Sequence, residues 1–551
     1  MATFQMTAHV LKRMARRAYD GAVDLVRSQS PQGRAKAAVR RAAEIRFEAL
    51  ARSVDATFSG KVLVDGTFDN ANYWFRVALL RAGLGLDKAR EIGLLGPYRR
   101  RYVRATFANF GIGECRDMAA TPADNGRAER VAADLLRGTK TADDVLRWKL
   151  PGGVDPAIVY DAILKRQRLA TVDPGKADFP ELVREAIVRI LRVIEILDGE
   201  RPDLVVMSHT VGMICGPLAY LAAARGVPVV LAFGLFGALR YTRFFARNDI
   251  FSFYDRPTGG EIDSLGQAQA NALAEIGQAY LRKRFGGDAD DLASTYAFKR
   301  SSPCVDRAAI CAQTGWHDDR PIVAVYASNW FDWPHQLGMT QFRDFHDWIA
   351  VTLEAARAAP QFNWLFKPHP AEDWFGGVSL EQVVAGFPGA AHVRVADKAW
   401  NNADVMQAID AIVTYHGTAG IEFTALGKPV MVPDVGKYDD CGFVLKATSR
   451  ADYVASLARA WWDGMDLDKA KRRAEIFAGW WFCAPEWQGG FVLADDSDRE
   501  ENYDRAVRLL DEYPGIGGRE IDSIGKWWAS QHRYYHTWKM SEASSYKLSN
   551  V

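Results

Sequence analysis

Several features that would assign this chain of 551 residues to a particular class of protein are missing from its sequence. Its six cysteines are scattered and form no CxxC pair, which argues against a zinc site or a disulfide framework and fits a reducing compartment. No apolar run approaches the ~20 residues that span a bilayer. The first residues also lack the continuous apolar segment of a signal peptide, because charges interrupt them. We therefore expect a cytoplasmic protein.

The sequence also lacks a large excess of charge of either sign, since 69 Lys and Arg nearly balance 68 Asp and Glu. Composition therefore gives no reason to expect a nucleic-acid partner. The exception is local, because residues 1–46 hold ten basic and three acidic residues. We expect a basic helical extension over 1–55, which either lies on the cytoplasmic face of the inner membrane or packs on the protein. The segment 524–540 mixes Trp, Tyr and Lys as interfacial segments do, but packing against the first domain is the favoured alternative.

What the sequence does contain is a regular alternation of short apolar strands and amphipathic helices, in two series. Strands are predicted at 61–68, 90–98, 202–210 and 227–234, and again at 321–328, 362–370, 391–397, 408–418 and 428–433. Continuous apolar strands between helices are typical of parallel sheets covered on both faces. The pattern predicts an α/β protein with two tandem Rossmann-like domains, 56–310 (with a helical insertion near 110–200) and 316–500, followed by a tail over 501–551. The functional cleft is expected between them, at the carboxyl ends of their strands.

The segment "YHGTAGIEFTALGKPVMVPDVGKYDDCGF" (415–443) combines a strand, a glycine turn and a helix. Such a turn points free backbone N–H groups and the positive end of the helix dipole at one place, where an anion can bind. His416, Gly417 and Thr418 are the predicted phosphate contacts, and Glu422 suits a ribose diol. The alternative is a plain capped helix, with Thr418 as N-cap and Glu422 opposing the dipole.

A second segment, "NWLFKPHP" (363–370), ends a predicted strand with a lysine, two prolines and a histidine. The prolines stiffen the turn and remove backbone N–H groups. Taken alone, the segment is more typical of a structural turn whose histidine caps a neighbouring element. Its place one strand earlier in the same predicted sheet as the 415–443 turn favours a shared phosphate site.

These segments, together with "ASNWFDWPHQLG" (327–338), resemble bacterial capsule and surface-polysaccharide biosynthesis proteins. Those are GT-B glycosyltransferases related to Kdo transferases and to the glycerophosphotransferases of teichoic acid synthesis. The resemblance covers roughly 320–445 well and is thinner near "VDGTFDNANYWFRVALLRA" and "PDLVVMSHTVG". It implies a metal-independent enzyme that needs no cofactor beyond its nucleotide-sugar co-substrate. It also implies that His369 donates to the donor's phosphate and that Lys367 supplies positive charge beside it.

Two loops after strands of the second domain add candidates. In 328–335, Asn329, Asp332 and His335 are possible nucleotide or sugar contacts, and the aromatic residues between them are possible stacking platforms. A loop that packs the junction between the domains is an equal alternative. In 436–443, Lys437 and Tyr438 are placed within reach of the donor, although a solvated loop explains them nearly as well. No DxD pair that would bind a metal follows a strand.

In the first domain, the candidates for the acceptor side follow predicted strands. Asp65, Asp69 and Asn70 lie in "VDGTFDN", and His209 lies in "VVMSHTVG". A base at these positions would deprotonate the acceptor hydroxyl. Asp65 is also typical of a turn that hydrogen-bonds its own backbone, and His209 of a buried structural histidine, so the identity of the base stays open.

The sequence therefore predicts a glycosyltransferase that moves a sugar from a nucleotide-activated donor to a surface polysaccharide or a lipid-linked glycan. Two alternatives remain. One is an isomerase similar to nucleotide-sugar 2-epimerases, and the other is a non-catalytic protein that binds a glycan or an assembly complex.

Overall fold

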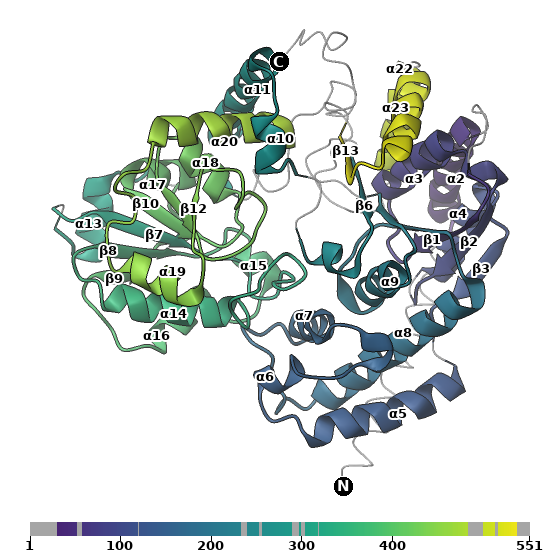
Figure 1. Ribbon diagram of the computed structural model, residues 1–551, viewed down its shortest axis with the longest axis horizontal. Coiled ribbons are helices and arrows are strands. Elements are labelled where there is room, and N and C mark those ends of the chain that lie inside the picture. Colours follow the sequence, from purple (N-terminus) through teal and green to yellow (C-terminus); the bar gives the residue numbers. More distant parts are fainter. Residues whose placement is uncertain are drawn as a thin grey trace.

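The computed structural model consists of two α/β halves that lie side by side (Figure 1). It describes residues 30–51, 58–97, 99–119, 121–232, 240–252, 256–288, 297–298, 304–317, 319–482, 500–512 and 516–536. The helix expected over 5–27 lies outside these ranges.

The first half is built on a seven-stranded sheet with the order β13-β6-β5-β4-β1-β2-β3. Its strands are β1 (Lys61–Gly66), β2 (Arg90–Leu95), β3 (Glu114–Asp117), β4 (Leu204–Met207), β5 (Val229–Leu231), β6 (Arg240–Phe244) and β13 (Tyr534–His536). Strands β1 to β5 run parallel, whereas β6 and β13 are antiparallel additions at one edge. The helices of this half are α2 (Pro31–Ala51), α3 (Ala71–Leu84), α4 (Arg100–Asn109), α5 (Pro122–Arg137), α6 (Ala142–Val145), α7 (Pro156–Gln167), α8 (Phe179–Glu200) and α9 (Gly212–Ala224).

The second half is built on a six-stranded parallel sheet with the order β12-β11-β10-β7-β8-β9. Its strands are β7 (Ile322–Tyr326), β8 (Asn363–Lys367), β9 (Val393–Val395), β10 (Ala411–Thr414), β11 (Val430–Val432) and β12 (Leu445–Lys446). Its helices are α13 (Arg307–Thr314), α14 (Phe345–Arg357), α15 (Glu372–Phe375), α16 (Leu380–Ala385), α17 (Asn402–Ala408), α18 (Ala419–Ala425), α19 (Arg450–Leu457) and α20 (Leu467–Phe482).

Both sheets have the strand order of a Rossmann fold, with the first strand of each series in the middle. The chain winds outward from β1 to β3 and then returns to place β4 on the other side of β1. In the second sheet it does the same with β7 and β10. Ligands of such folds bind where the winding direction reverses, at the carboxyl ends of the two middle strands. The prediction of two tandem Rossmann-like domains is thus confirmed, and the fold marks two positions, β1/β4 and β7/β10, for functional side chains.

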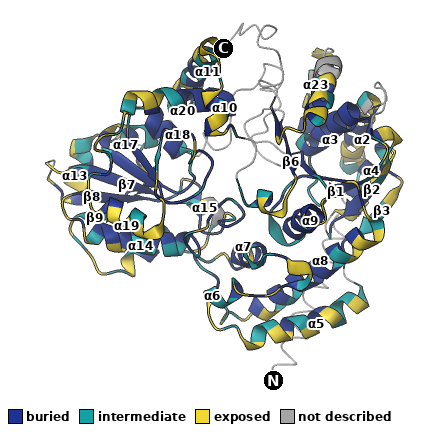
Figure 2. Cartoon of the chain, viewed as in Figure 1, coloured by how far each residue is buried: buried dark blue, intermediate teal, exposed yellow. Residues whose placement is uncertain are grey.

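The hydrophobic core explains why the expected strands form. The strands of both sheets are buried along most of their length, while the outer faces of the helices are exposed (Figure 2). Strand β8 shows the pattern, because all five of its residues are buried, its terminal lysine included. Short strands that add to the sheet edges, such as β3 and β12, carry partly exposed residues and have no long apolar run by which the sequence alone would reveal them.

Two segments connect the halves in ways that sequence order does not show. Helices α10 (Gly259–Asp263) and α11 (Gln267–Phe285) precede the expected boundary at 310, yet α11 packs along α20 of the second half. Helices α22 (Glu500–Glu512) and α23 (Ile516–Ser530) return to the first half, where they pack on α2 and α3, and β13 joins the first sheet. The tail aromatics Trp527 and Tyr535 are fully buried there. None of the described helices is both long enough and apolar enough to span a bilayer.

Candidate functional site

A cavity of about 230 Å³ lies at the carboxyl ends of three adjacent strands of the second sheet, β10, β7 and β8. The residues that end β10, β7 and β8 are in register across the sheet, Thr414 beside Tyr326 and Tyr326 beside Lys367, and all three line the cavity. The cavity therefore occupies the β7/β10 reversal that the fold singles out. The turns that follow β8 and β10, the loop after β9 and the helices α15, α17 and α18 supply the rest of its polar lining.

The turn after β8 brings two predicted residues, Lys367 and His369, into the cavity wall. Burial lowers the pKa of Lys367 to about 8, against the opposing pull of Asp397. Burial also lowers the pKa of His369, although Asp332 and Glu372 act in the other direction. The Ala371 N–H donates to His369 Nδ1 at 3.2 Å, so the proton of the neutral ring is on Nε2. This site thus pairs a cation that titrates near neutral pH with a neutral hydrogen-bond donor.

The turn after β10 contributes Gly417 and Thr418. Thr418 precedes α18 but makes no side-chain capping bond, so it is not the conventional N-cap that was the alternative interpretation. Helix α18 has only seven residues. Tyr438 supports the turn from behind, because its hydroxyl donates to the Gly417 carbonyl at 2.6 Å. A Cβ atom on Gly420 would lie 2.0 Å from that hydroxyl oxygen, so the contact requires glycine there.

Glu422 lines the same cavity, but its carboxylate is already held by an arginine from another part of the chain. Arg284, at the end of α11, donates its Nε–H to Glu422 Oε1 at 2.7 Å, and both side chains are almost fully buried. Arg284 also contacts the Thr418 hydroxyl at 3.3 Å. A buried carboxylate beside a phosphate would repel it, and the guanidinium cancels that charge. Glu422 is therefore placed as the partner of Arg284 in the cavity wall, which the expected ribose contact did not anticipate.

Lys398 is a cation of the cavity that sequence reasoning missed. It follows β9 and is held by Glu372 at 2.6 Å and Asp373 at 3.0 Å, which lie just after the His369 turn. Hydrogen bonds to these two carboxylates outweigh burial and raise the pKa of Lys398 above its usual range. The sequence feature that could have identified Lys398 was its position directly after a predicted strand of the second sheet. Trp400, which follows in the same loop, adds an aromatic face.

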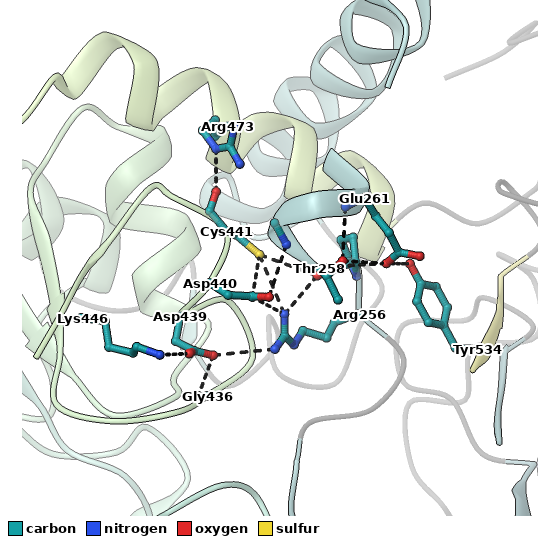
Figure 3. Close-up of polar contacts among 12 residues, drawn as sticks. Arg256, Thr258, Glu261, Gly436, Asp439, Asp440, Cys441, Lys446, Arg473 and Tyr534 are labelled. Carbon is teal, nitrogen blue, oxygen red and sulfur yellow. Dashed lines mark hydrogen bonds and ion pairs between the residues drawn. The ribbon is translucent and has the colours of Figure 1, made fainter. Parts of the chain in front are cut away.

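The loop at 436–443 is tied down by a segment from between the halves (Figure 3). Arg256 forms ion pairs with Asp440 and, at 3.7 Å, with Asp439. Lys446 also pairs with Asp439 at 2.7 Å, and Arg473 donates to the Cys441 carbonyl. The loop is thus an ordered support for the Gly417 turn and not the solvated loop of the alternative interpretation.

Four predicted donor contacts are not among the described residues that line the cavity: His416, Lys437, Tyr438 and Asn329. His416 packs edge-on against Phe345, and burial lowers its pKa to about 3, with Lys437 acting in the same direction. The Lys437 ammonium lies over the Trp481 ring, 4.7 Å from its centre. Their predicted contacts with a donor therefore stay predictions.

The loop that contains 328–335 forms a junction between the two halves. His335 Nδ1 lies 2.7 Å from Asp161 Oδ1 of α7, and the Gln336 backbone N–H donates to the other carboxylate oxygen at 3.0 Å. The Gln336 side chain donates to the Thr210 carbonyl, just beyond β4. Burial opposes a charge on His335, but Asp161 outweighs it and raises the pKa of His335. His335 therefore belongs to a loop that packs the junction between the halves, as the alternative interpretation expected. Asp332 of the same loop lies close enough to His369 to oppose the lowering of that histidine's pKa.

In the first half, Asp65 and His209 meet at the β1/β4 reversal through a residue that sequence reasoning overlooked. The Ser208 hydroxyl donates to Asp65 Oδ2 at 2.9 Å, and His209 Nδ1 lies 3.0 Å from the same Ser208 oxygen. The Thr67 backbone N–H donates to the other Asp65 oxygen at 2.8 Å, which is the expected turn bond. Because Ser208 gives its proton to Asp65, its oxygen accepts from His209 Nδ1–H, and the ring presents an unprotonated Nε2. Burial lowers the pKa of His209 to about 4.

Asp69 and Asn70, expected on the acceptor side, are occupied in holding α2 and α3. Asp69 accepts from Arg40 at 2.6 Å and from the Trp74 indole at 2.8 Å. Asn70 is the N-cap of α3 and accepts from the Tyr73 N–H at 2.8 Å. Both therefore have structural partners away from the β1/β4 reversal, where Asp65 lies.

No family model and no curated protein matches the chain. Solved structures that resemble it include the UDP-GlcNAc 2-epimerase of Neisseria meningitidis bound to UDP-GlcNAc, with 12% identity over 82% of this chain and 100% of that chain and a TM-score of 0.22. Another is the glycosyltransferase SnogD of Streptomyces nogalater, with 14% identity over 82% of this chain and 100% of that one and a TM-score of 0.23. A third is a glycosyltransferase of Rickettsia africae, with 10% identity over 84% of this chain and 99% of that chain and a TM-score of 0.23. At these scores the likenesses carry no weight for activity, which must be argued from the site.

Proposed function

We propose that the protein is a glycosyltransferase of the GT-B type that uses a nucleotide-activated sugar as donor. The observation that carries the proposal is the cavity at the β7/β10 reversal, where Lys367, His369 and Lys398 converge with the Gly417–Thr418 turn. Cations and N–H donors at one position suit the phosphates of a nucleotide sugar. Helix α18 has only seven residues, and Lys398 is paired with two carboxylates, so Lys367 supplies the main positive charge of the site.

The chemistry follows from where charge develops. Transfer of the sugar leaves negative charge on the departing nucleotide phosphate, and donors aimed at that oxygen stabilise the transition state. His369 acts as a neutral donor through Nε2–H, and Lys367 supplies the positive charge beside it. In the first half, His209 Nε2 accepts the proton of the acceptor hydroxyl, with Asp65 and Ser208 setting its tautomer. Independence of metal ions and cofactors remains part of the proposal.

The finer parts of the proposal concern the acceptor and the place of action. We propose a growing surface polysaccharide or a lipid-linked glycan as acceptor, at the cytoplasmic face of the inner membrane. The motifs at 363–370 and 415–443 support this through their resemblance to capsule biosynthesis enzymes. Nucleic acid has no part in it.

A panel of CMP-, UDP-, GDP- and CDP-activated sugars tests the donor site directly. We expect one nucleotide class to bind to the wild-type protein, and His369→Ala to lose about 10²–10³-fold in turnover. His369→Gln keeps an N–H donor and should lose less. If no activated sugar binds or is consumed, the proposal is wrong.

The same assay separates the alternatives. A transferase releases the free nucleotide only when an acceptor is present, or slowly to water. An isomerase similar to 2-epimerases would change the sugar without needing an acceptor, and a binding protein would do neither.

A further inference from the structure

The loop 329–336 passes from the second half to the first and carries two side chains that the proposed mechanism does not use. Asp332 is exposed and Trp333 is partly exposed, whereas the other six residues of the loop are buried. Of the remaining aromatic residues, Trp330 is 3% exposed and Phe331 is 1% exposed. Trp333 is therefore the large aromatic side chain of this loop that a ligand can reach.

The two ends of the loop are anchored in different halves of the protein. Trp330 donates its indole N–H to a backbone carbonyl of the second half at 2.6 Å. Gln336 donates its side-chain amide to the Thr210 carbonyl at 2.7 Å and accepts from the Gly212 N–H at 3.3 Å, both in the first half. The loop is thus held across the junction, and Trp333 lies between its anchors.

Trp333 lies against the start of α9, on the acceptor side of this junction. A Cβ atom on Gly212, the first residue of α9, would lie 3.5 Å from Trp333 Cη2. Gly212 comes only three residues after His209, the proposed base. On the other side, Asp332 is within electrostatic reach of His369, whose pKa it acts to raise. The loop therefore lies between the two sets of residues that the proposed reaction needs.

The backbone of Trp333 adopts a conformation that its own side chain disfavours. Its φ is 54°, in the left-handed region, which is an outlier for a bulky residue. Pro334 adds to the conflict, because the residue before a proline favours an extended conformation. The other four described non-glycine residues with positive φ all adjoin a helix end, and Trp333 does not. Strain of this kind clusters at ligand contacts and active sites, so packing alone explains this tryptophan poorly.

The surroundings of Trp333 suit a sugar ring. Tryptophan has a flat apolar face, and a pyranose has a face of C–H groups with hydroxyls at its edge. Asp332, next in the chain and exposed, is an acceptor for such hydroxyls. Lys165 of α7 holds the indole in place, because its ammonium lies 5.6 Å from the centre of the Trp333 ring. A lipid chain fits this position less well, since it would cover a carboxylate without bonding to it.

We propose that Trp333 stacks on the terminal sugar of the acceptor and that Asp332 accepts hydrogen bonds from the hydroxyls of that sugar. The inference rests on the proposed transfer reaction and names the residues that select its acceptor. Recognition then depends on the terminal sugar and needs no lipid carrier. Stacking on Trp333 holds the sugar beside the loop that carries His209.

The test uses the full-length protein and lipid-free trisaccharides of glucose, galactose, mannose and N-acetylglucosamine. Saturation-transfer NMR measures their dissociation constants in the absence of any donor. The site variant is Trp333→Gly, which removes the ring and suits the left-handed backbone. Trp333→Phe keeps a ring, and Trp462→Ala is the control, at a partly buried tryptophan of the second half that packs on Phe362.

We expect Trp333→Gly to weaken trisaccharide binding at least tenfold, Trp333→Phe to lose less and Trp462→Ala to stay within twofold of the wild type. The melting temperature of Trp333→Gly should equal or exceed that of the wild type, because glycine relieves the strain. A tryptophan with a purely structural role would give a lower melting temperature instead. Asp332→Asn should weaken binding at least threefold, and it replaces Trp333→Gly if that variant does not fold.

Failure of this inference and failure of the transfer reaction give different results. Calorimetry with the preferred nucleotide sugar should show unchanged donor binding in Trp333→Gly. If no activated sugar is consumed, the proposed reaction is wrong, but a selective loss of trisaccharide binding in Trp333→Gly still supports the sugar contact. The inference is overturned if no trisaccharide binds to the wild-type protein, if Trp333→Gly binds within twofold of it, or if donor binding falls as much as trisaccharide binding.

Discussion

At the scale of single residues, the donor cavity is defined by a lysine that is unusually easy to neutralise. Burial lowers the pKa of Lys367 to about 8, with Asp397 opposing the shift. The ammonium form, which attracts phosphate, therefore predominates below pH 8 and disappears above it. Lys398 does not share this behaviour, because its two carboxylate partners raise its pKa.

This difference predicts the pH dependence of donor binding. The dissociation constant of the preferred nucleotide sugar should be flat from pH 6 to 7.5 and should rise above pH 8, by at most tenfold per pH unit. Lys367→Arg keeps its charge throughout and should remove the rise. Calorimetry at five pH values between 6 and 9.5 measures the dissociation constant of each protein. A wild-type affinity that is constant up to pH 9.5 would contradict the role of Lys367.

Ser208 is the second residue on which the chemistry depends, since it connects Asp65 to His209. The wild-type protein should hold neutral His209 with its proton on Nδ1. Replacing Ser208 with Ala removes the oxygen that accepts the hydrogen bond from His209 Nδ1–H. The ring should therefore shift toward the Nε2–H tautomer. Nitrogen-15 NMR of histidine-labelled protein reads the tautomer without any assay of activity.

Ser208→Thr keeps a hydroxyl and is the matched control, with the wild-type tautomer expected. Donor binding should be unchanged in both variants because the second half holds the donor cavity. Turnover should fall at least tenfold in Ser208→Ala alone. An unchanged tautomer in Ser208→Ala would refute the connection.

At the scale of an element, the short helix α18 and its preceding turn keep their shape because Tyr438 lies against Gly420. A methyl group at Gly420 would force the tyrosine hydroxyl off the Gly417 carbonyl. Overpacking of this kind costs about 1–3 kcal/mol. Gly420→Ala should therefore lower the melting temperature and weaken donor binding about tenfold.

Two variants sharpen that test. Gly199→Ala on α8 has open space around the new methyl group, so it should be neutral or slightly stabilising. Tyr438→Phe alone removes the hydrogen bond to the Gly417 carbonyl without adding bulk, so it should weaken donor binding while lowering the melting temperature less than Gly420→Ala does. If Gly420→Ala binds the donor as wild type does, the supporting role of Tyr438 is wrong.

At the scale of the whole molecule, the two halves meet through the buried pair of His335 and Asp161. Asp161 outweighs burial and raises the pKa of His335 above its value in the unfolded chain, about 6.5. The pair therefore contributes stability that is fully present below pH 6.5 and is lost as pH rises through the raised pKa. Wild-type melting temperature should fall between pH 6 and pH 9 for this reason.

His335→Gln removes the titrating group while keeping an amide near Asp161, so its melting temperature should change less over the same range. It should also be lower than that of the wild type at pH 6, because Asp161 loses a charged partner. His532→Gln, at an exposed histidine, is the control and should follow the wild type. Parallel pH profiles for wild type and His335→Gln would rule out the charged pair.

Local sequence pattern was enough to predict nine of the thirteen strands and the two turns of the donor cavity, but not the short strands β3, β6, β12 and β13. Apolar runs such as "KVLV" in β1 and "NWLF" in β8 form buried strands wherever a parallel sheet can cover them, so local pattern was sufficient. Lys367 and Thr418 were found for the same reason, because Lys367 ends β8 and Thr418 lies four residues after the end of β10. Parallel topology then brings those strand ends together.

The contacts of these side chains depend on how distant parts of the chain pack together. Glu422 is paired with Arg284, 138 residues earlier, and Asp69 with Arg40 on a helix that precedes β1. The junction of His335 with Asp161 spans 174 residues. No local pattern encodes such partners, since a carboxylate after a strand looks alike in sequence whether it meets a ligand or an arginine. The choice is made when the helices pack, because a charge buried by packing must find its opposite there.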